Sequence, residues 1–432
     1  MTQPCDILLS GGFVVTMERP QSRTLWPGSV AIRGADIVAV GSSAEVEAQW
    51  RASVRFDCSA HAVLPGLVNS HVHAGMSLLK SRAGDRPLRR RLREVVWPFA
   101  EAMDERSSYL GTRLGCLEMM KAGITTFADM WPFPDATAEA VKSCGLRAVL
   151  ASYGRTYASG ELEALAAAPR RWNDALLTPA VGIQSLYGVA ADTLRQAAAT
   201  ARDCGLRIHI HASETREEVD DGHDFNEIDA LGLMRPGTIL AHGVHTTVRE
   251  LELAAERGAG IAHNPIANAK LGTGIAPLAL MQARLPVGLG TDSAAANDRH
   301  DLFDEMRMAL FLDRHRAEAS TLAPVDALAM ATIGGAIVLG LESDIGSIEP
   351  GKRADIITID LDDPRFVPLH RDRPAQVLSH LVFSATAADV DTVIVDGRIV
   401  VRNGVVENLD EAEIIAKGCE AAASRLAAAG LA

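Results

Sequence analysis

The sequence predicts an α/β fold, a (β/α)8 or TIM barrel joined to a small composite β-sandwich formed by the N- and C-terminal segments. Three observations predict it. Short apolar runs alternate with helical patterns through the middle of the chain, strand-like segments occupy both ends, and polar residues recur where the apolar runs end. Alternation of this kind is typical of βα units that build a parallel sheet.

Eight short apolar runs are the expected barrel strands. They cover 63–68, 125–129, 147–152, 179–184, 207–211, 238–242, 260–264 and 286–291. The intervening helical patterns include 108–122, 193–204 and 247–257, and the helices expected after the eighth run are 301–312 and 324–339. An open doubly wound sheet is the alternative, but no Gly-x-Gly-x-x-Gly follows the first run, so a dinucleotide-binding fold is unsupported.

Both ends of the chain have the alternating pattern of antiparallel strands. At the N-terminus these are 6–10, 13–17, 29–32 and 37–40, and at the C-terminus 355–359, 390–395 and 398–401. We expect the two ends to pack together as one small sheet domain. The predicted organisation is 1–61 for the first part of the sandwich, 62–343 for the barrel, and 344–432 for the second part with a closing amphipathic helix over 410–426.

The composition indicates a globular protein that does not bind polyanions. The chain has 432 residues, of which 48% are hydrophobic and 22% charged, and its formal net charge is −13. Nucleic-acid partners require a basic face, so we expect none. The one basic run, 86–93, is predicted to be a solvated helix face, with contact to an anionic substrate group as the lesser alternative.

The cysteines and the N-terminus predict a soluble cytoplasmic protein. None of the six cysteines forms a Cys-x-x-Cys pair, and we expect reduced thiols. The first residues lack the basic and apolar regions of a signal peptide, and no apolar run approaches membrane-spanning length, so no membrane partner is expected.

The stretch that ends the first apolar run carries His71 and His73. In an extended chain residues i and i+2 point to the same side, so the two imidazoles project together and form half of a metal site. The alternative, one core histidine beside one solvated histidine, is the commoner meaning of an isolated His-x-His.

The ends of the later apolar runs favour the interpretation of His71 and His73 as metal ligands. Histidine or aspartate follows the fifth to eighth runs, at His209, His211, His242, His263 and Asp292. The carboxyl ends of barrel strands form one rim, where the active site of a TIM barrel lies. We assign His71, His73, His211 and Asp292 as ligands of one divalent ion. His209 competes with His211 for this role, and His242 is either a fifth ligand or a neighbour that polarises the reacting group.

The chain resembles the amidohydrolase superfamily, in its mononuclear branch of aminohydrolases that act on nitrogen heterocycles. That branch includes methylthioadenosine/S-adenosylhomocysteine deaminases and triazine chlorohydrolases. The matching stretches are PGLVNSHVHAGMSLL (65–79), HASET (211–215), AHGVH (241–245), HNPIANAKLGTGIAPL (263–278), GTDSAAAND (290–298) and EPGKRAD (349–355). The resemblance runs almost end to end. It implies a (β/α)8 barrel, a composite sandwich, a single divalent metal and a hydrolytic reaction.

The resemblance also implies one metal rather than two. Two-metal members carry a bridging lysine at the end of the fourth strand, where this chain has Gln184 and Ser185. Zinc is the expected ion, and iron or manganese would suit the same ligands.

Three residues are expected to carry the chemistry. Asp292 takes a proton from the attacking water, Glu214 protonates the ring nitrogen, and His242 hydrogen-bonds the developing oxygen. Glu214 could instead be a surface carboxylate at a helix N-terminus. Trp97, Gln184 and His245 are assigned to substrate binding. His263 and Asn264 are expected to orient loops, and no Gly-x-Ser-x-Gly supports a serine hydrolase.

Two positions depart from the adenosine-type members. Those enzymes carry a ribose-contacting histidine where this chain has Gln184, and a ribose-binding glutamate where it has Ala100, with Glu101 one residue late. The expected substrate is therefore a free base or a pterin-like or triazine-like ring.

Three functions stay open: deamination of a nitrogen heterocycle, hydrolytic displacement of chloride, alkylamine, or an amide or urea nitrogen, and a non-enzymatic scaffold. The complete ligand set with Glu214 argues against the scaffold. The presence of Asp292 favours deamination, because triazine-type members often vary that residue. The resemblance alone implies a homo-oligomer.

Overall fold

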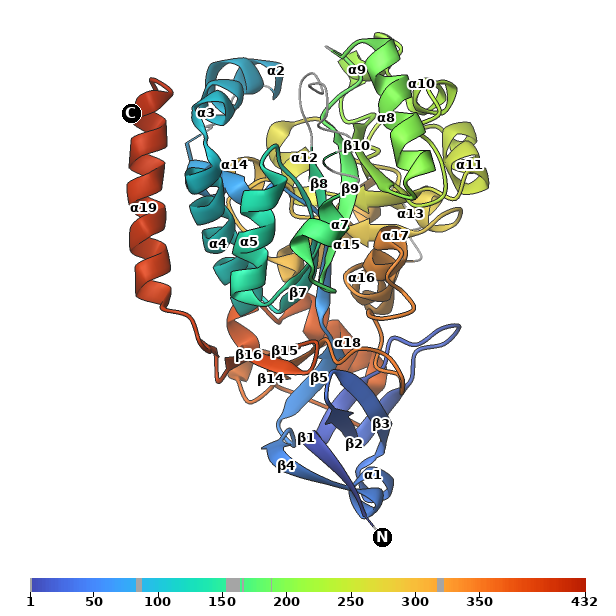
Figure 1. The fold of residues 1–432 in the computed structure, drawn as a ribbon. Helices are drawn as coiled ribbons and strands as arrows, with labels where there is room; N and C mark the ends of the chain where they lie inside the picture. The colour runs from blue at the N-terminus through green and yellow to red at the C-terminus, as the bar shows by residue number, and fades with distance from the viewer. Residues whose placement is uncertain (1, 83–87, 153–163, 165–166, 188, 317–321) are drawn as a thin grey trace.

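The computed structural model describes residues 2–82, 88–152, 164, 167–187, 189–316 and 322–432. Its upper part is a parallel barrel and its lower part a sheet domain that carries the N-terminus (Figure 1). The eight barrel strands are hydrogen-bonded in chain order: β6 (Leu67–Val72), β7 (Ile124–Met130), β8 (Arg147–Ser152), β9 (Leu177–Ile183), β10 (Arg207–Ala212), β11 (Thr238–His242), β12 (Gly260–His263) and β13 (Val287–Leu289). The structure therefore confirms the predicted barrel.

The barrel closes where its first and last strands meet. The chain that follows β13 lies beside the end of β6, and the backbone N–H of Asp292 donates to the carbonyl of His71 at 3.0 Å. Every residue of β6 and of β7 is buried. Strands covered on both faces have near-continuous apolar sequences, which is why the strands could be found as apolar runs.

Helices surround the barrel and connect its strands. The longer ones are α4 (Glu105–Lys121), α5 (Pro134–Cys144), α8 (Ala191–Asp203), α11 (Val248–Glu256), α12 (Pro265–Leu271) and α15 (Leu302–Arg316). Their starts follow local chemistry: Asp104 and Ser107 form a capping box before α4, and Thr247 and Glu250 form one before α11.

The expected first strand, 63–68, is wrong as a single element. Its first half belongs to β5 (His61–Pro65) of the lower sheet, and its second half begins β6 of the barrel. Gly66 separates them, and a Cβ there would lie 2.2 Å from Thr125 Oγ1. Because both strands are buried, the apolar run continues across the boundary and does not mark it.

The expected helix 324–339 is two helices, α16 (Pro324–Met330) and α17 (Ile333–Leu339). The backbone leaves the helical conformation at Thr332, where φ is −133° and ψ is −100°. The preceding carbonyl, that of Ala331, accepts a hydrogen bond from the Val68 N–H of β6 at 2.8 Å. The break thus ties this region to the first barrel strand.

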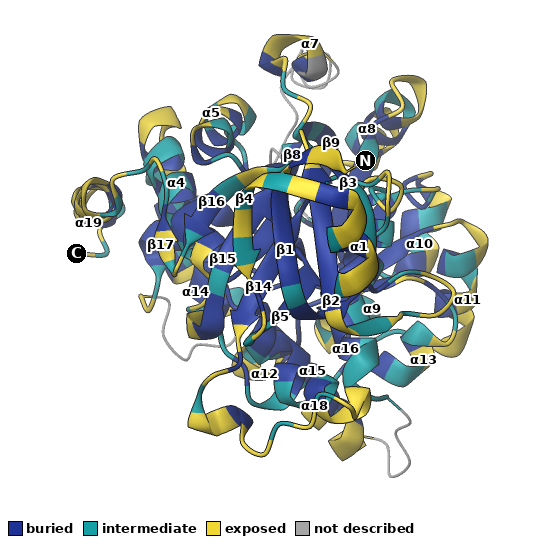
Figure 2. Ribbon diagram, turned by 90° about the horizontal axis from the view of Figure 1, so that it is seen from below, coloured by how far each residue is buried: buried dark blue, intermediate teal, exposed yellow. Residues whose placement is uncertain are grey.

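The lower domain is one nine-stranded sheet built from both ends of the chain. Its N-terminal strands are β1 (Gln3–Val15), β2 (Thr24–Arg33), β3 (Asp36–Ser42), β4 (Trp50–Asp57) and β5, and its C-terminal strands are β14 (Ile356–Asp360), β15 (Val390–Val395), β16 (Arg398–Arg402) and β17 (Val405–Val406). The two sets join where β5 and β14 pair antiparallel. Seen from below, the buried strands β1, β5 and β14 lie under the ring of barrel helices (Figure 2).

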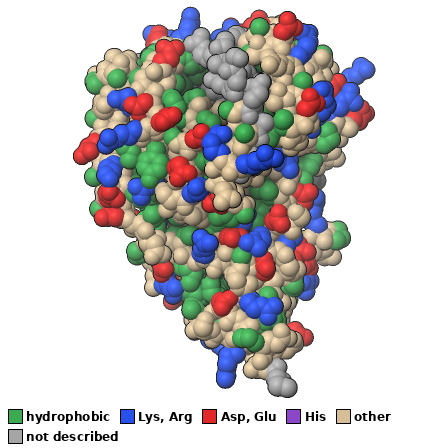
Figure 3. Space-filling model, in the orientation of Figure 1, with side chains coloured by type: hydrophobic (Ala, Val, Ile, Leu, Met, Phe, Trp, Pro, Cys, Tyr) green, Lys and Arg blue, Asp and Glu red, His purple; other side chains and the backbone are tan. Residues whose placement is uncertain are grey.

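The closing helix, expected over 410–426, is α19 (Glu411–Ala428). It leaves the sheet domain and runs along α4 of the barrel (Figure 1), with ion pairs Lys121–Glu411 at 2.9 Å and Arg425–Asp104 at 3.0 Å. Within the described part of the chain, no helix combines the length and apolar character needed to cross a membrane. Basic and acidic side chains are interspersed over the face shown in Figure 3.

Candidate metal centre and active site

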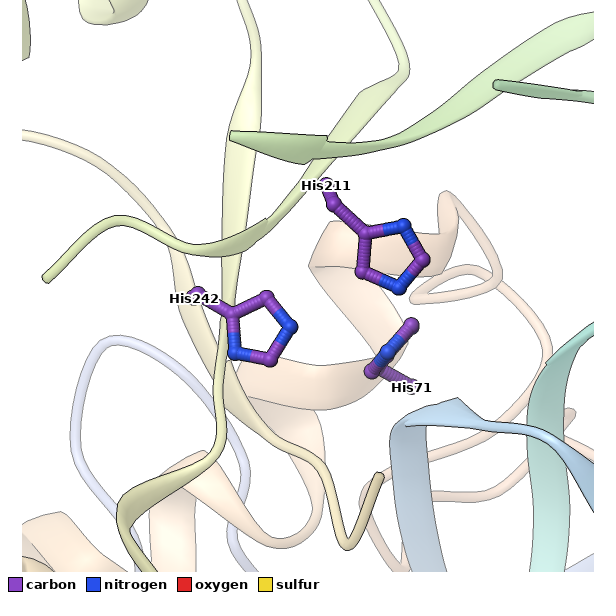
Figure 4. Close-up of side chains that lie close together, drawn as sticks. All are labelled: His71, His211 and His242. Atoms are coloured by element: carbon purple, nitrogen blue, oxygen red, sulfur yellow. The ribbon is translucent and has the colours of Figure 1, made fainter. Parts of the chain in front are cut away.

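Histidines from three strands converge at the carboxyl-terminal rim of the barrel. His71 lies near the end of β6, His211 lies near the end of β10 and His242 ends β11, and all three are buried. Figure 4 shows their rings directed toward a common space. Ligand atoms of two overlapping groups, His71–His211–His242 and His71–His73–Asp292, each lie within 4.8 Å of one another.

Backbone carbonyls orient two of these rings. Nδ1 of His73 lies 2.6 Å from the Met130 carbonyl oxygen, and Nδ1 of His211 lies 2.7 Å from that of Gln184. A carbonyl oxygen only accepts, so each Nδ1 carries the proton and each Nε2 keeps its lone pair. The two Nε2 atoms face each other at 3.2 Å. Two lone pairs at that distance repel unless a cation lies between them.

His71 and Asp292 complete the set. Nε2 of His71 is buried with no hydrogen-bond partner among the described residues, and it lies 3.7 Å from Asp292 Oδ1. Nε2 of His73 lies 3.6 Å from the same oxygen. Ligand atoms around a tetrahedral zinc lie roughly 3.3–3.5 Å apart, because each bond is about 2.0–2.2 Å long. The four predicted ligands are thus brought together with the spacing and donor types that fit one divalent cation.

His209, which sequence reasoning left as a competitor of His211, lies behind the ligands. Its Nε2 is 2.8 Å from Nδ1 of His71. Since Nε2 of His71 faces Asp292, the Nδ1–H of His71 donates to His209. Burial and the nearby histidines lower the pKa of His209 to about 3, so the ring is neutral and able to accept.

His242 is held with its other nitrogen toward the cavity. Its Nδ1 accepts hydrogen bonds from the side-chain amides of Asn264, at 3.2 Å, and Asn268, at 3.0 Å. An accepting Nδ1 leaves the proton on Nε2, which lies 3.9 Å from Glu214 Oε2. In this arrangement His242 presents a donor to the cavity rather than a lone pair. Asn264 was expected to orient loops and here contacts the His242 side chain, and Asn268 is a partner that the sequence did not indicate.

Glu214 is a largely enclosed carboxyl beside the cluster, with 13% of its side chain exposed. Burial and the charge of Asp292 raise its pKa to about 8, although Arg91 acts in the opposite direction. A carboxyl with this pKa holds a proton at neutral pH and can donate it. The expected alternative, a surface carboxylate, is thus wrong, because Glu214 lies at the cavity with its side chain largely enclosed.

Unusual backbone conformations accompany the site. Ser213, His242 and Asp292 all have positive φ, at 49°, 77° and 57°. Side chains other than glycine rarely adopt this region, and such residues cluster at functional sites where the surroundings hold them. Each of the three lies at or just beyond the end of a strand, where the chain turns into the rim.

A cavity of about 350 Å³ opens onto these groups. Its lining comprises His73, Met76, Leu88, Arg91, Leu92, Val96, Trp97, Ala100, Glu101, Pro132, Gln184, Ser185, Tyr187, Val189, His211, Glu214, Glu218, His242, Leu271, Asp292 and Ser293. The predicted substrate residues Trp97 and Gln184 are among them. His245 is not: its Nε2 lies 2.6 Å from the Thr273 carbonyl oxygen, outside the lining.

Tyr187 and Glu218 line the cavity without having been predicted, and so does Arg91, from the basic run for which substrate contact was the lesser alternative. For Arg91 the prediction of a solvated helix face is wrong, because the side chain is only 2% exposed. The signal was present in the sequence: consecutive residues of a helix point to different faces, so a run of arginines between leucines cannot be solvated throughout.

Comparisons with known proteins agree with this geometry. The model of the amidohydrolase family matches residues 62–400. A 5-methylthioadenosine/S-adenosylhomocysteine deaminase of Pelotomaculum thermopropionicum is 38% identical over 95% of this chain and 97% of its own length. A 5'-deoxyadenosine deaminase of Methanothermobacter thermautotrophicus is 39% identical over 86% of this chain and 88% of its own length.

Solved structures share the whole fold. An adenosine deaminase from Xanthomonas campestris with bound zinc superimposes with a TM-score of 0.92 and 31% identity, over 99% of this chain and 100% of that one. An atrazine chlorohydrolase from Arthrobacter aurescens has a TM-score of 0.86 at 24% identity over 96% of this chain and 100% of that one, a likeness of fold alone. With its barrel, its rim of histidines and these matches, the chain belongs to the amidohydrolase family.

Proposed function

We propose that this protein is a metal-dependent aminohydrolase that replaces an exocyclic amine of a nitrogen heterocycle with a hydroxyl group and releases ammonia. One observation carries the proposal. The Nε2 atoms of His71, His73 and His211 and a carboxylate oxygen of Asp292 lie close together, and the largely enclosed acid Glu214 lies in the same cavity.

The proposed cofactor is one divalent ion held by His71, His73, His211 and Asp292. Zinc is our first choice, since the donor set suits it and the similar adenosine deaminase from Xanthomonas campestris binds zinc. Iron or manganese would suit the same donors. The ion would supply Lewis acidity and make a water nucleophilic at neutral pH.

The chain's own residues move the protons. Asp292 accepts a proton from the attacking water as the new C–O bond forms. Protonated Glu214 donates its proton to the adjacent ring nitrogen, and the Nε2–H of His242 hydrogen-bonds the developing oxygen. The amine then takes up the proton held by Asp292, the C–N bond breaks and ammonia leaves. The proton of the new hydroxyl returns to Glu214, so the product is the ring carbonyl tautomer with a protonated ring nitrogen.

The proposed substrate is a compact heterocycle. Ala100, Glu101 and Gln184, the positions that depart from the adenosine-type pattern, all line the cavity. The cavity volume of about 350 Å³ is near the lower end of small-molecule sites, which are typically ~300–1,000 Å³. A free base or a pterin-like or triazine-like ring fits this description. Trp97 and Gln184 are proposed to contact it, while His245, which is not among the lining residues, is not included. A homo-oligomer is proposed on the family resemblance, and a cytoplasmic location on the six cysteines, which form no Cys-x-x-Cys pair.

The test is a substrate screen on zinc-loaded enzyme beside Glu214→Gln. Amino-, chloro- and alkylamino-substituted purines, pyrimidines, pterins and triazines are supplied, and each leaving group is measured separately. We expect ammonia from one ring type and a loss of about 10²–10⁴-fold in kcat for Glu214→Gln, the range for a general acid.

The matched control is Glu217→Gln, on the same segment but at the surface, where Glu217 pairs with Arg89 at 2.8 Å. It should retain wild-type kcat. Release of chloride or an alkylamine without ammonia would contradict deamination and keep the site. Equal activity of Glu214→Gln and wild type would contradict the role of Glu214.

A further inference from the structure

Arg91 is a buried cation inside the cavity. It ends the short helix α2 (Leu88–Arg91), lines the cavity together with Glu214 and Asp292, and is 2% exposed. Among the residues that the structure describes, its Nε has no hydrogen-bond partner and no carboxylate forms an ion pair with it. Burying a guanidinium without a partner costs free energy, so we expect a ligand group that accepts its hydrogen bonds to bind there.

The two arginines before it in α2 behave differently. Arg89 pairs with Glu217 at 2.8 Å and Asp221 at 3.0 Å, and Arg90 pairs with Glu94 at 2.7 Å. Their side chains are 41% and 64% exposed. The same helix therefore places two paired arginines at the surface and one unpaired arginine in the cavity.

Arg91 lies at the reacting end of the cavity. Its positive charge lowers the pKa of Glu214 and of His73, both beside the proposed metal site. Neither Glu214 nor Asp292 is close enough to form an ion pair with it. Because Arg91 lines the same cavity as Glu214 and Asp292, we expect a substrate group that meets it to lie on or near the reacting ring rather than at the end of a long side chain.

We propose that Arg91 determines specificity by binding an acidic oxygen substituent of the substrate ring, a carboxylate or an ionised ring oxygen. A guanidinium presents paired N–H donors that match such a group, and the pairing is strong where water is excluded. The preferred substrate is then an anionic amino-heterocycle rather than a neutral nucleoside. This inference rests on the proposed deaminase function.

The experiment compares matched substrate pairs on zinc-loaded enzyme. Each pair has one amino-purine, amino-pyrimidine or amino-triazine ring with an acidic oxygen substituent, and the same ring with hydrogen or a carboxamide in its place. The variants are Arg91→Met, which keeps the length and removes the charge, and Arg91→Lys, which keeps the charge and loses the paired donors. Arg90→Met is the surface control, and thermal melting verifies that each variant folds.

We expect wild type to prefer the acidic member, and Arg91→Met to lower kcat/KM for it by about 100-fold while changing the neutral member less than about threefold. Arg91→Lys should lie between, and Arg90→Met should match wild type. An equal loss on both members would overturn the inference, because Arg91 would then only balance the charge of Glu214. A wild-type preference for the neutral member would overturn it too.

A binding measurement separates this inference from the reaction. The hydroxyl-substituted product of each ring is titrated calorimetrically into wild type and Arg91→Met. If no ring releases ammonia but the acidic product binds wild type at least tenfold more tightly than Arg91→Met, the deaminase proposal fails and the role of Arg91 stands. If neither variant distinguishes acidic from neutral products, the role of Arg91 fails whatever the reaction.

Discussion

Arginines are buried at both ends of the barrel, and they differ in their ion pairs with carboxylates of the described residues. At the end that faces the sheet domain, Arg147 of β8 pairs with Asp355 at 3.1 Å and with Asp396 at 3.4 Å. Although burial lowers its pKa, these carboxylates raise it above the usual value. At the opposite end, burial lowers the pKa of Arg91, and Asp292 and Glu214 offset this only in part.

The two arginines show two reasons for burying a charge: Arg147 has a structural role, and Arg91 is assigned a functional one. Arg147 is satisfied within the protein and joins the barrel to the lower sheet, where Asp355 also accepts the Asp396 N–H at 2.8 Å. Arg91 has no such partner among the described residues, and we propose that a ligand supplies one. An ion pair within the fold indicates a structural role, whereas an unpaired cation at a cavity indicates recognition. Three predictions test whether the two ends are independent.

Removal of the metal should have the largest effect and should act at the cavity end alone. Chelation is expected to lower kcat by more than about 100-fold, and to lower the free energy of unfolding by about 4 kcal/mol when zinc had been present near 1,000 times its Kd. Activity assays and thermal melting, with zinc added back, measure both. Unchanged activity in demonstrably metal-free protein would contradict the proposed centre.

Asp355→Ala should give the opposite pattern. It removes one of the two carboxylate partners of the buried Arg147 guanidinium and leaves only Asp396, so we expect a loss of about 3–5 kcal/mol in the free energy of unfolding. Denaturant unfolding measures this, and kcat/KM of the folded fraction should stay within about twofold. The control is Asp36→Ala, which removes an exposed partner of Arg353 and should cost about 0–1 kcal/mol. A large fall in kcat/KM for folded Asp355→Ala would show that the two ends are coupled.

The smallest expected effect is the pH dependence contributed by Glu214. Its pKa in the folded protein, about 8, exceeds the ordinary 4.5, so the folded protein holds a proton that the unfolded chain releases. The stability this contributes is fully present below pH 4.5 and is lost as the pH rises through about 8. Above that pH, kcat/KM should fall about tenfold per unit as the acid form disappears. Glu214→Gln should lack both changes, and parallel profiles for the two proteins would contradict the assignment.

The strands could be predicted because buried strands have apolar sequences. The rim could be predicted because polar residues stand at the ends of these apolar runs. His71, His73, His211 and Asp292 were found in this way. Two features escaped. Periodicity could not separate β5 from β6, since both are buried and Gly66 alone marks the change of sheet. It also could not show which way Arg91 points, since that depends on how α2 packs over the cavity.

The placement of His245 could not be foreseen for a related reason. Its position after a rim histidine suggested the cavity, yet the chain turns at Gly243 and directs the ring toward the Thr273 carbonyl. The break in the helix expected over 324–339 depends on a hydrogen bond from Val68, a residue far away in sequence. Such choices are made by tertiary contacts rather than by local pattern.

The hydrogen bond from Asp292 to the His71 carbonyl lies at the seam where the first and last strands of the barrel meet. The same two residues are proposed to bind one ion, so a bound cation would fasten that seam. The enzyme would then be active only when the barrel is closed, because a chain whose last strand has not joined its first lacks the full set of metal ligands. A molecule in which this seam has opened would therefore lack activity.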